Sequence, residues 1–298
     1  MLGSLVACGG GGGTSTPDAP EVTDIGFNRP TKSLKANMEV SEDNWTEVGP
    51  ADLTCLNTPN GDVATTVQVA LSTVVRDFQS DNLVPNTQIT VFNNQDTANP
   101  FQTTAADGNA AVTFTIPVGT KRFGYKMIDP SSLDTLLLNQ KVTPTEPTQT
   151  EGSIRAVSKS TGQTLPALIG ISRTQGTGVL AGAIRDCQDR EISGFIATVT
   201  TNPARTVEEI QHAPGTDTYY FSSSVGLPVR HTQKAQGSED GLFMIVELVP
   251  AATAFVQIWG YIDDAALAAD DLQLVGELQT QVIADTVITG SFEPLRTN

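Results

Sequence analysis

The sequence predicts an all-β protein built from two tandem β-sandwiches that follow a flexible N-terminal tether. Two parts of the chain repeat one pattern of strands and turns, and each contains an Asp-Gly dipeptide followed by a strand that ends at proline. The N-terminal part is instead rich in glycine and lacks apolar periodicity, so it cannot bury enough surface to fold. A repeated plan with regularly spaced turn signals favours sandwiches over helical or mixed folds.

The chain begins with a short apolar stretch that ends at Cys8 and is followed by five glycines. The residues LVAC (5–8) resemble the lipobox of bacterial lipoproteins, whose cysteine is acylated and becomes the new N-terminus. The resemblance implies that residues 1–8 are a truncated signal and lipobox. It also implies that Cys8 carries lipid and that the protein is anchored at the outer membrane or cell surface. The stretch before Cys8 is shorter than a secretory leader, so we expect a longer natural leader. The alternative is an ordinary surface cysteine in a flexible terminus.

Residues 9–35 predict a flexible tether rich in Gly, Thr and Pro. About fifteen residues of such a chain span roughly 20 Å, enough to hold a folded body away from a membrane. We expect residues 36–65 to form a small ordered lead-in to the first sandwich.

Internal repeats define the two modules. Residues 74–91 (VVRDFQSDNLVPNTQITV) match residues 183–199 (AIRDCQDREISGFIATV) with a one-residue gap, and DGNAAVTFTIP is matched by DGLFMIVELVP at the same spacing. Such self-similarity indicates two units of one plan. We therefore expect the first sandwich over 66–142 and the second over 176–298, joined by a linker at 143–175.

Each Asp-Gly dipeptide predicts a tight turn before a strand. Asp-Gly is typical of type I′ hairpins, which need positive φ, so both Gly108 and Gly241 are expected in that conformation. Pro117 and Pro250 mark the strand ends because proline cannot donate to the ladder. The first strand alternates apolar residues with threonine, whereas the second is apolar on both faces, which predicts cover on both sides.

The order of these signals resembles the carboxypeptidase regulatory-like domain. The matching features are Val-x-Asp, a turn, VPNTQITV, a threonine, Asp-Gly, a strand and proline. The resemblance implies transthyretin-like, that is Ig-like, sandwiches of about seven strands each. In zinc carboxypeptidases this domain accompanies a catalytic domain that contains a His-x-x-Glu pair. This sequence has no counterpart, since Lys234 follows His231 and Gly215 follows His212 at that spacing.

Composition and motifs exclude several classes of function. The 298 residues carry a net charge of −16, which argues against nucleic acid as a partner. No apolar run of about 18 residues is present, so no spanning helix is predicted. The sequence lacks a nucleophile elbow, a zinc-protease motif and a P-loop, so we expect neither enzymatic activity nor a cofactor.

Three cysteines remain to be assigned. If Cys8 is acylated, Cys55 and Cys187 form an even pair in an exported protein, where disulfides persist. The alternative is two separate buried thiols that pack as small apolar groups. No metal site is expected, because neither cysteine has a second Cys or His at ligand spacing.

The second sandwich carries an insertion at 201–239 that contains both histidines. Loops on rigid sandwiches often bind ligands, so Tyr219, Tyr220 and His231 are the first candidates for a ligand or glycan site. The favoured interpretation is different: aromatic side chains of this kind are typical of a half-buried strand.

Acidic residues concentrate between Asp263 and Asp271. Carboxylates are ligands that calcium prefers, but the alternating spacing of a dedicated calcium loop is absent. A solvated short helix or loop is therefore favoured over a calcium site.

These observations predict a lipid-anchored, non-catalytic cell-envelope protein with a structural, adhesive or assembly role. Its partners would be the membrane, reached through the N-terminal lipid, and other envelope proteins. The alternative is a ligand- or glycan-binding module that uses loops of the second sandwich.

Overall fold

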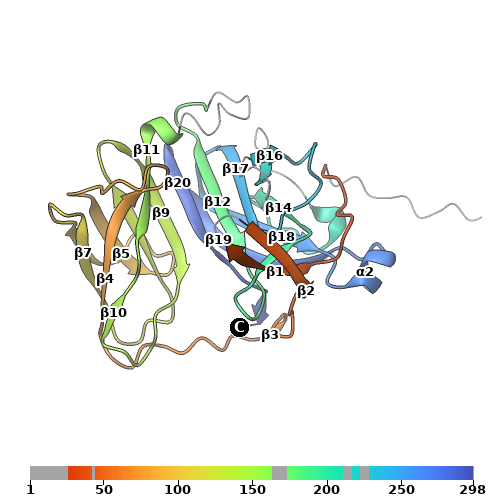
Figure 1. Cartoon of the computed structure of the whole chain (residues 1–298), viewed down its shortest axis with the longest axis horizontal. Coiled ribbons are helices and arrows are strands. Elements are labelled where there is room, and N and C mark those ends of the chain that lie inside the picture. Colours follow the sequence, from red (N-terminus) through yellow and green to blue (C-terminus); the bar gives the residue numbers. More distant parts are fainter. Residues whose placement is uncertain (1–25, 42–43, 163–172, 211–216, 222–227, 298) are drawn as a thin grey trace, which may run out of the picture.

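The computed structural model describes residues 26–41, 44–162, 173–210, 217–221 and 228–297. Strands predominate over short helices, which confirms the predicted all-β class. Two strand-rich modules lie side by side along the long axis of the molecule (Figure 1).

The first module follows a stretch of N-terminal strands. These N-terminal strands are β1 (Lys35–Ser41), β2 (Asn44–Pro50) and β3 (Thr58–Pro59). The strands of the first module and of the segment after it are β4 (Val69–Asp77), β5 (Gln88–Asn93), β6 (Pro100–Ala105), β7 (Ala111–Ile116), β8 (Phe123–Ile128), β9 (Ser132–Gln140), β10 (Thr148–Thr150) and β11 (Ile154–Ser158).

The second module contains the remaining elements. Its first half comprises β12 (Gly178–Ile184), β13 (Glu191–Ser193), β14 (Phe195–Thr200), the 3-10 helix η1 (Val207–Glu209), β15 (Asp217–Phe221) and β16 (Pro228–Arg230). Its second half comprises β17 (Leu242–Leu248), β18 (Ala251–Gly260), α2 (Asp264–Ala268), β19 (Gln273–Val282), β20 (Thr286–Phe292) and β21 (Arg296–Thr297).

The two modules share one topology, as the repeats predict. In the first module β4 pairs with β7 antiparallel, and β5 pairs with β8, which pairs with β9. In the second, β12 pairs with β17, and β14 pairs with β18, which pairs with β19. Even the parallel neighbours correspond, because β4 lies beside β10 and β11 as β12 lies beside β20.

The repeated Arg-Asp-x-Gln sequence forms the same turn in both modules. A buried aspartate begins each turn: Asp77 Oδ1 accepts the Ser80 N–H at 2.8 Å, and Asp186 Oδ1 accepts the Gln188 N–H at 2.9 Å. Each turn then contains an aspartate at positive φ, with values of 57° at Asp81 and 59° at Asp189. Asp tolerates this conformation, so the repeated sequence accounts for the similar turn in both modules.

The alternation predicted for the strand after Gly108 and the two apolar faces predicted for the strand after Gly241 are both confirmed. In β7 the side chains of Val112, Phe114 and Ile116 are buried in the core of the first module. In β17, Phe243 and Ile245 belong to the large core of the second module, whereas Met244 and Val246 lie in a separate cluster. Strand β17 is therefore covered on both faces, which explains its continuous apolar sequence.

The modules are joined by one continuous sheet. Residues 134–138 of β9 pair in parallel with residues 286–290 of β20, and β20 pairs in parallel with β12 (Figure 1). Leu136 and Leu138 of β9 therefore belong to the core of the second module. The two modules therefore share a sheet and part of a core, whereas the sequence predicted two separate sandwiches joined by a linker. The expected linker at 143–175 includes β10 and β11, which pair with β4 because Ile154 and Ala156 bury their side chains in the first module's core.

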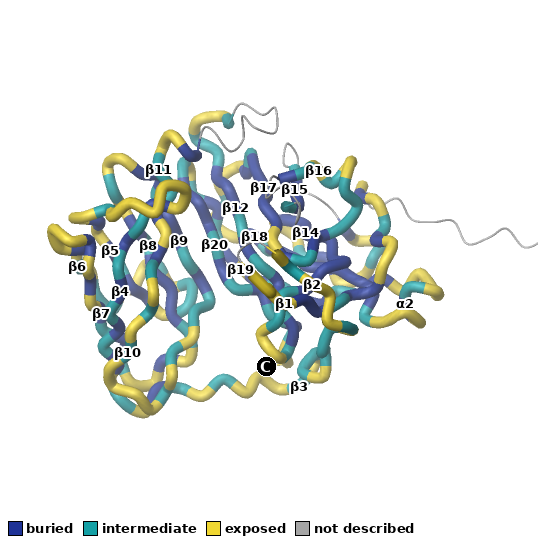
Figure 2. Tube along the Cα trace, in the orientation of Figure 1, coloured by how far each residue is buried: buried dark blue, intermediate teal, exposed yellow. Residues whose placement is uncertain are grey.

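The N-terminal strands belong to the second module, which corrects the expected lead-in to the first. Strand β1 pairs with β13, and β3 pairs with β21. Ordered chain also begins earlier than the expected end of the tether at residue 35, because Phe27 and Leu34 are buried. The first module is thus inserted, in sequence, into the second. Figure 2 shows the buried strands of both modules, with exposed residues on the loops and on the β1–β2 hairpin.

The Asp-Gly turns differ from the predicted hairpins. Gly241 has φ of +66°, as expected, but Gly108 does not have positive φ and Ala110 takes that conformation with φ of 61°. The strands on either side of Asp107 do not pair with each other, since β6 pairs with β5 and β7 with β4. The first turn carries the chain between sheets, so a type I′ geometry is not required there.

Valine at these two glycines should therefore have unequal effects. At Gly241 a Cβ would sit 3.0 Å from the Ile184 carbonyl oxygen in addition to the positive φ, so Gly241→Val should cost about 1 to 3 kcal/mol of unfolding free energy. Gly108 has open space around it, so Gly108→Val should cost less than about 0.5 kcal/mol. Chemical denaturation of both variants measures the difference. Equal losses of unfolding free energy in the two variants would contradict the different conformations assigned to Gly241 and Gly108.

Candidate functional site

An apolar hollow with a volume of about 400 Å³ lies at the junction of the two modules. Its floor is the face of the continuous sheet that points away from the second module's core. Val179 and Ala181 of β12, Val287 of β20 and Met244 of β17 line it. We call this hollow the junction cavity.

The first module supplies the opposite wall of the junction cavity. Tyr125 and Met127 of β8 and Ile154 of β11 line it, and Phe78, about half exposed, also contributes. The cavity lies between the first module and the outer face of the sheet, which carries apolar side chains on both faces. Its size falls within the range of small-molecule sites.

One carboxyl group faces this apolar wall without a partner. Glu151, just after β10, lines the cavity, and its Oε2 atom is buried with no hydrogen-bond partner in the described part of the chain. Burial raises the pKa of Glu151 above its usual value. Burial also raises the pKa of Tyr125 well above its usual value, and the negative charge of Glu151 adds to that effect. The two groups are therefore electrostatically coupled within one apolar wall.

The basic residue that lines the cavity already has an ion-pair partner. Arg155 lines the cavity, but its guanidinium donates to the Asp81 carboxylate, which also accepts from Arg76. Those contacts lower the pKa of Asp81, with the Arg155 hydrogen bond as the largest cause. Glu151 is therefore the charged side chain at the cavity that has no ion-pair partner in the described part of the chain.

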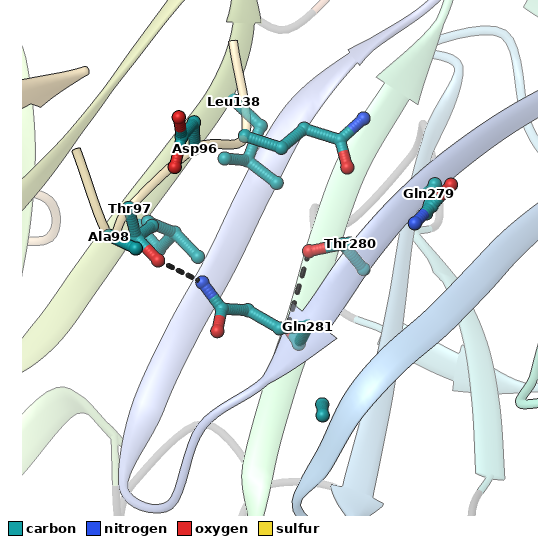
Figure 3. Close-up of a pocket in the computed structure, with 10 residues that line it drawn as sticks. Asp96, Thr97, Ala98, Leu138, Gln279, Thr280 and Gln281 are labelled. Carbon is teal, nitrogen blue, oxygen red and sulfur yellow. Dashed lines mark hydrogen bonds between the residues drawn. The ribbon is translucent and has the colours of Figure 1, made fainter. Parts of the chain in front are cut away.

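A second, polar cleft of about 360 Å³ also lies between the modules (Figure 3). Gln281 of β19 points toward the loop that contains Asp96 and Thr97, and Gln279 and Thr280 of the same strand also line the cleft. The groups largely satisfy one another: Gln281 Nε2 donates to Thr97 Oγ1 at 2.7 Å, and Asp96 accepts from Asn99 at 2.9 and 3.0 Å. We interpret this cleft as a polar contact between the two modules that helps to fix their relative position.

The two tyrosines predicted as ligand residues project to opposite sides of β15. Tyr220 is fully buried in the large core, with its ring edge-on to Phe195, and its hydroxyl accepts the Ala197 N–H at 3.1 Å. Tyr219 is buried in the cluster with Met244. The Thr218 hydroxyl donates to the Ala197 carbonyl at 3.1 Å. Side chains of β15 therefore satisfy both backbone groups of Ala197 at the edge of β14. The tyrosines do not form one site.

His231 lies at the surface end of the insertion. Its Nε2 atom is 3.1 Å from Asp217 Oδ1, and its ring centroid is 4.4 Å from that of Phe27. Burial lowers the pKa of His231 and outweighs the opposing charge of Asp217. Within the described residues Nδ1 is buried without a hydrogen-bond partner, beside a shallow hollow that includes Phe27. His212 lies outside the described residues.

The acidic segment 263–271 contains helix α2, in agreement with the favoured interpretation. Asp263 caps the helix by accepting the Ala266 N–H at 2.8 Å, and Asp264 pairs with Lys35 at 2.9 Å. Asp270 accepts from the Tyr261 hydroxyl. Where the structure is described, no group of three or more His, Cys, Asp or Glu side chains is arranged to hold a metal ion.

The sequence-predicted cysteine pair lies at the base of the second module. Cys55 and Cys187 are joined as a disulfide with their Cα atoms 5.8 Å apart. Cys8 falls outside the described residues. Among the helices that are described, none has the length and apolar character needed to cross a membrane.

Comparisons with known proteins give distant structural similarity. No family model matches the chain, and no curated protein matches it. The Bacillus anthracis TIE protein aligns over 77% of this chain and 34% of its own, with 10% identity and a TM-score of 0.25. The chain thus corresponds to about a third of that protein's length.

Two pilins align over more of their own length. The shaft pilin SpaA from Lactobacillus rhamnosus GG aligns over 78% of this chain and 98% of its own, with 9% identity and a TM-score of 0.23. The major pilin from Streptococcus pyogenes aligns over 76% and 97%, with 10% identity and a TM-score of 0.23. These scores are too low for any inference about this chain.

Proposed function

We propose that the chain is a lipid-anchored, non-catalytic protein of the cell envelope, with a structural, adhesive or assembly role. The observation that carries the proposal is the LVAC sequence at residues 5–8, followed by a glycine run that ends before the folded body begins. A single acyl chain binds membranes only marginally, so stable anchoring would require more than one acyl chain on Cys8.

The fold supports a body held at one end. The described chain begins beside α2, where Phe27 packs in a cluster with Trp259 and Tyr261. The first module lies at the opposite end of the long axis (Figure 1). A protein tethered through its N-terminus would therefore present the first module away from the membrane.

The alternative of a glycan-binding module has weaker support. Tyr219 and Tyr220 are buried, so a sugar could not stack on them without opening the second module. Of the three residues that prompted this hypothesis, only His231 remains a candidate for ligand contact.

Substituting Cys8 tests the anchor. Growing cells that express the full-length gene should incorporate a clickable fatty acid into the wild-type protein and retain it in the membrane fraction. Cys8→Ser should abolish both signals, because serine offers no thiol to the acylating enzymes. The matched control is Cys55→Ser with Cys187→Ser, which should still be labelled. An unlabelled, freely soluble wild type would exclude the proposal.

A further inference from the structure

The junction cavity combines an apolar lining with one unpartnered carboxyl group. Apolar side chains from both modules form its walls, among them Val179, Met244 and Met127. Leaving a buried carboxyl oxygen without a partner is unfavourable, so such a group in a native structure requires an explanation. Glu151 Oε2 is in that position in the described part of the chain.

A hydrogen-bond donor on a bound molecule would satisfy this oxygen. A cationic donor forms a stronger bond to a carboxylate than a neutral donor does, and the bond gains strength in apolar surroundings. The remainder of the molecule would have to be apolar, because the rest of the wall offers mainly aliphatic and aromatic side chains.

The charge of the protein favours the same choice. The chain has a net charge of −16, which attracts cations and repels anions at long range. An anionic amphiphile would need Arg155, but that guanidinium is bound to Asp81. A carboxylate placed in the cavity would also face Glu151.

We propose that the junction cavity is a binding site for a small cationic amphiphile, namely a compact apolar molecule that carries one primary amine. The amine would donate to Glu151, and the apolar part would lie between the outer face of the continuous sheet and the wall formed by the first module. The site is independent of the lipid anchor and of any adhesive role.

Calorimetric titration of the purified full chain with octylamine, octanol and octanoate tests the proposal. These probes share an alkyl chain and differ in the head group. We expect octylamine to bind most tightly, octanol about tenfold more weakly, and octanoate more weakly still. Glu151→Gln should reduce octylamine affinity by about tenfold while changing octanol affinity by less than about twofold.

Two further variants locate the site. Glu146→Gln removes the same charge from an exposed position in the same segment and should leave octylamine binding within about twofold of wild type. Ala181→Leu adds bulk to the cavity floor and should weaken octylamine and octanol alike, provided the variant keeps the wild-type far-UV spectrum and melting temperature. Failure of wild type to bind octylamine would overturn the proposal, as would equal affinity for all three probes. Equal losses in Glu151→Gln and Glu146→Gln would also overturn it, because binding would then follow net charge.

Discussion

Replacing both Cys55 and Cys187 with serine is expected to lower the free energy of unfolding by about 3 to 5 kcal/mol. The two cysteines are separated by 132 residues, and the loop they close contains the whole first module. The chain-entropy estimate for a loop of that length is about 5 kcal/mol, because the cross-link removes many conformations from the unfolded chain.

The folded state should survive the loss of this disulfide. The same two loops are also held by two hydrogen bonds that do not involve the sulfur atoms: Cys187 N–H donates to the Asp52 carbonyl at 2.9 Å, and Asp52 N–H donates to the Asp186 side chain at Oδ2 at 3.0 Å. The effect should therefore appear as lower stability of an intact fold, measured as a lower urea midpoint together with a somewhat steeper slope, because the unfolded chain without the cross-link exposes more surface.

Reduction of the wild type supplies the control. Dithiothreitol should destabilise the wild type by about the same amount and leave the double serine variant unchanged. Wild type and variant that unfold at the same urea concentration, with and without reductant, would show that the disulfide does not contribute to stability.

The repeats made the module plan predictable, because each turn depends on residues close together in sequence. The buried aspartates Asp77 and Asp186 and the alternation in β7 are local signals of this kind. The pairing of β9 with β20 joins residues about 150 positions apart and leaves no local mark. Both strands carry apolar side chains on each face, and that pattern is equally compatible with cover by a sheet, a helix or another module.

Only one feature of the sequence predicted any part of the junction cavity. The continuous apolar sequence of β17 predicts cover on both faces, but the residues on the opposite wall of the cavity, such as Tyr125 and Met127, lie about 115 residues earlier in the chain. Glu151 gave no signal, because a single carboxyl group in a Thr- and Pro-rich stretch is ordinary for a solvated linker. Only the placement of β10 and β11 against β4 brings it to an apolar wall.

Arg122 is expected to be the most sensitive charged residue in the described chain. Its guanidinium makes paired hydrogen bonds to Asp62, at 2.6 and 2.9 Å, and to Glu293, at 3.0 and 3.1 Å. Glu293 also accepts from Lys141 at 2.7 Å. The side chains of Arg122, Asp62 and Glu293 are 11%, 14% and 17% exposed, so solvent screens them weakly. This cluster joins the segment after β3, the first module and the end of β20.

Arg122→Met should lower the free energy of unfolding by about 3 to 5 kcal/mol at neutral pH, because it leaves two mostly buried carboxylates with only the half-exposed Lys141 as a nearby cation. Arg205→Met is the matched control. Arg205 also makes two hydrogen bonds to one glutamate, Glu277, at 2.7 and 3.2 Å, but its side chain is 56% exposed. Its loss should cost less than about 1 kcal/mol.

The pH dependence separates this charge effect from a loss of packing. Burial alone would raise the pKa of Asp62 and of Glu293, but the hydrogen bonds and charge of Arg122 outweigh it and hold both below their ordinary values of 3.8 and 4.5. A lowered pKa in the folded state contributes stability that is present above those values and is lost as pH falls below them. The deficit of Arg122→Met should therefore be full at pH 7 and shrink as the pH falls below about 4, as urea denaturation at each pH would measure. A deficit that stays constant over that range would assign the role of Arg122 to packing of its aliphatic part, and the carboxylates would then not depend on its charge.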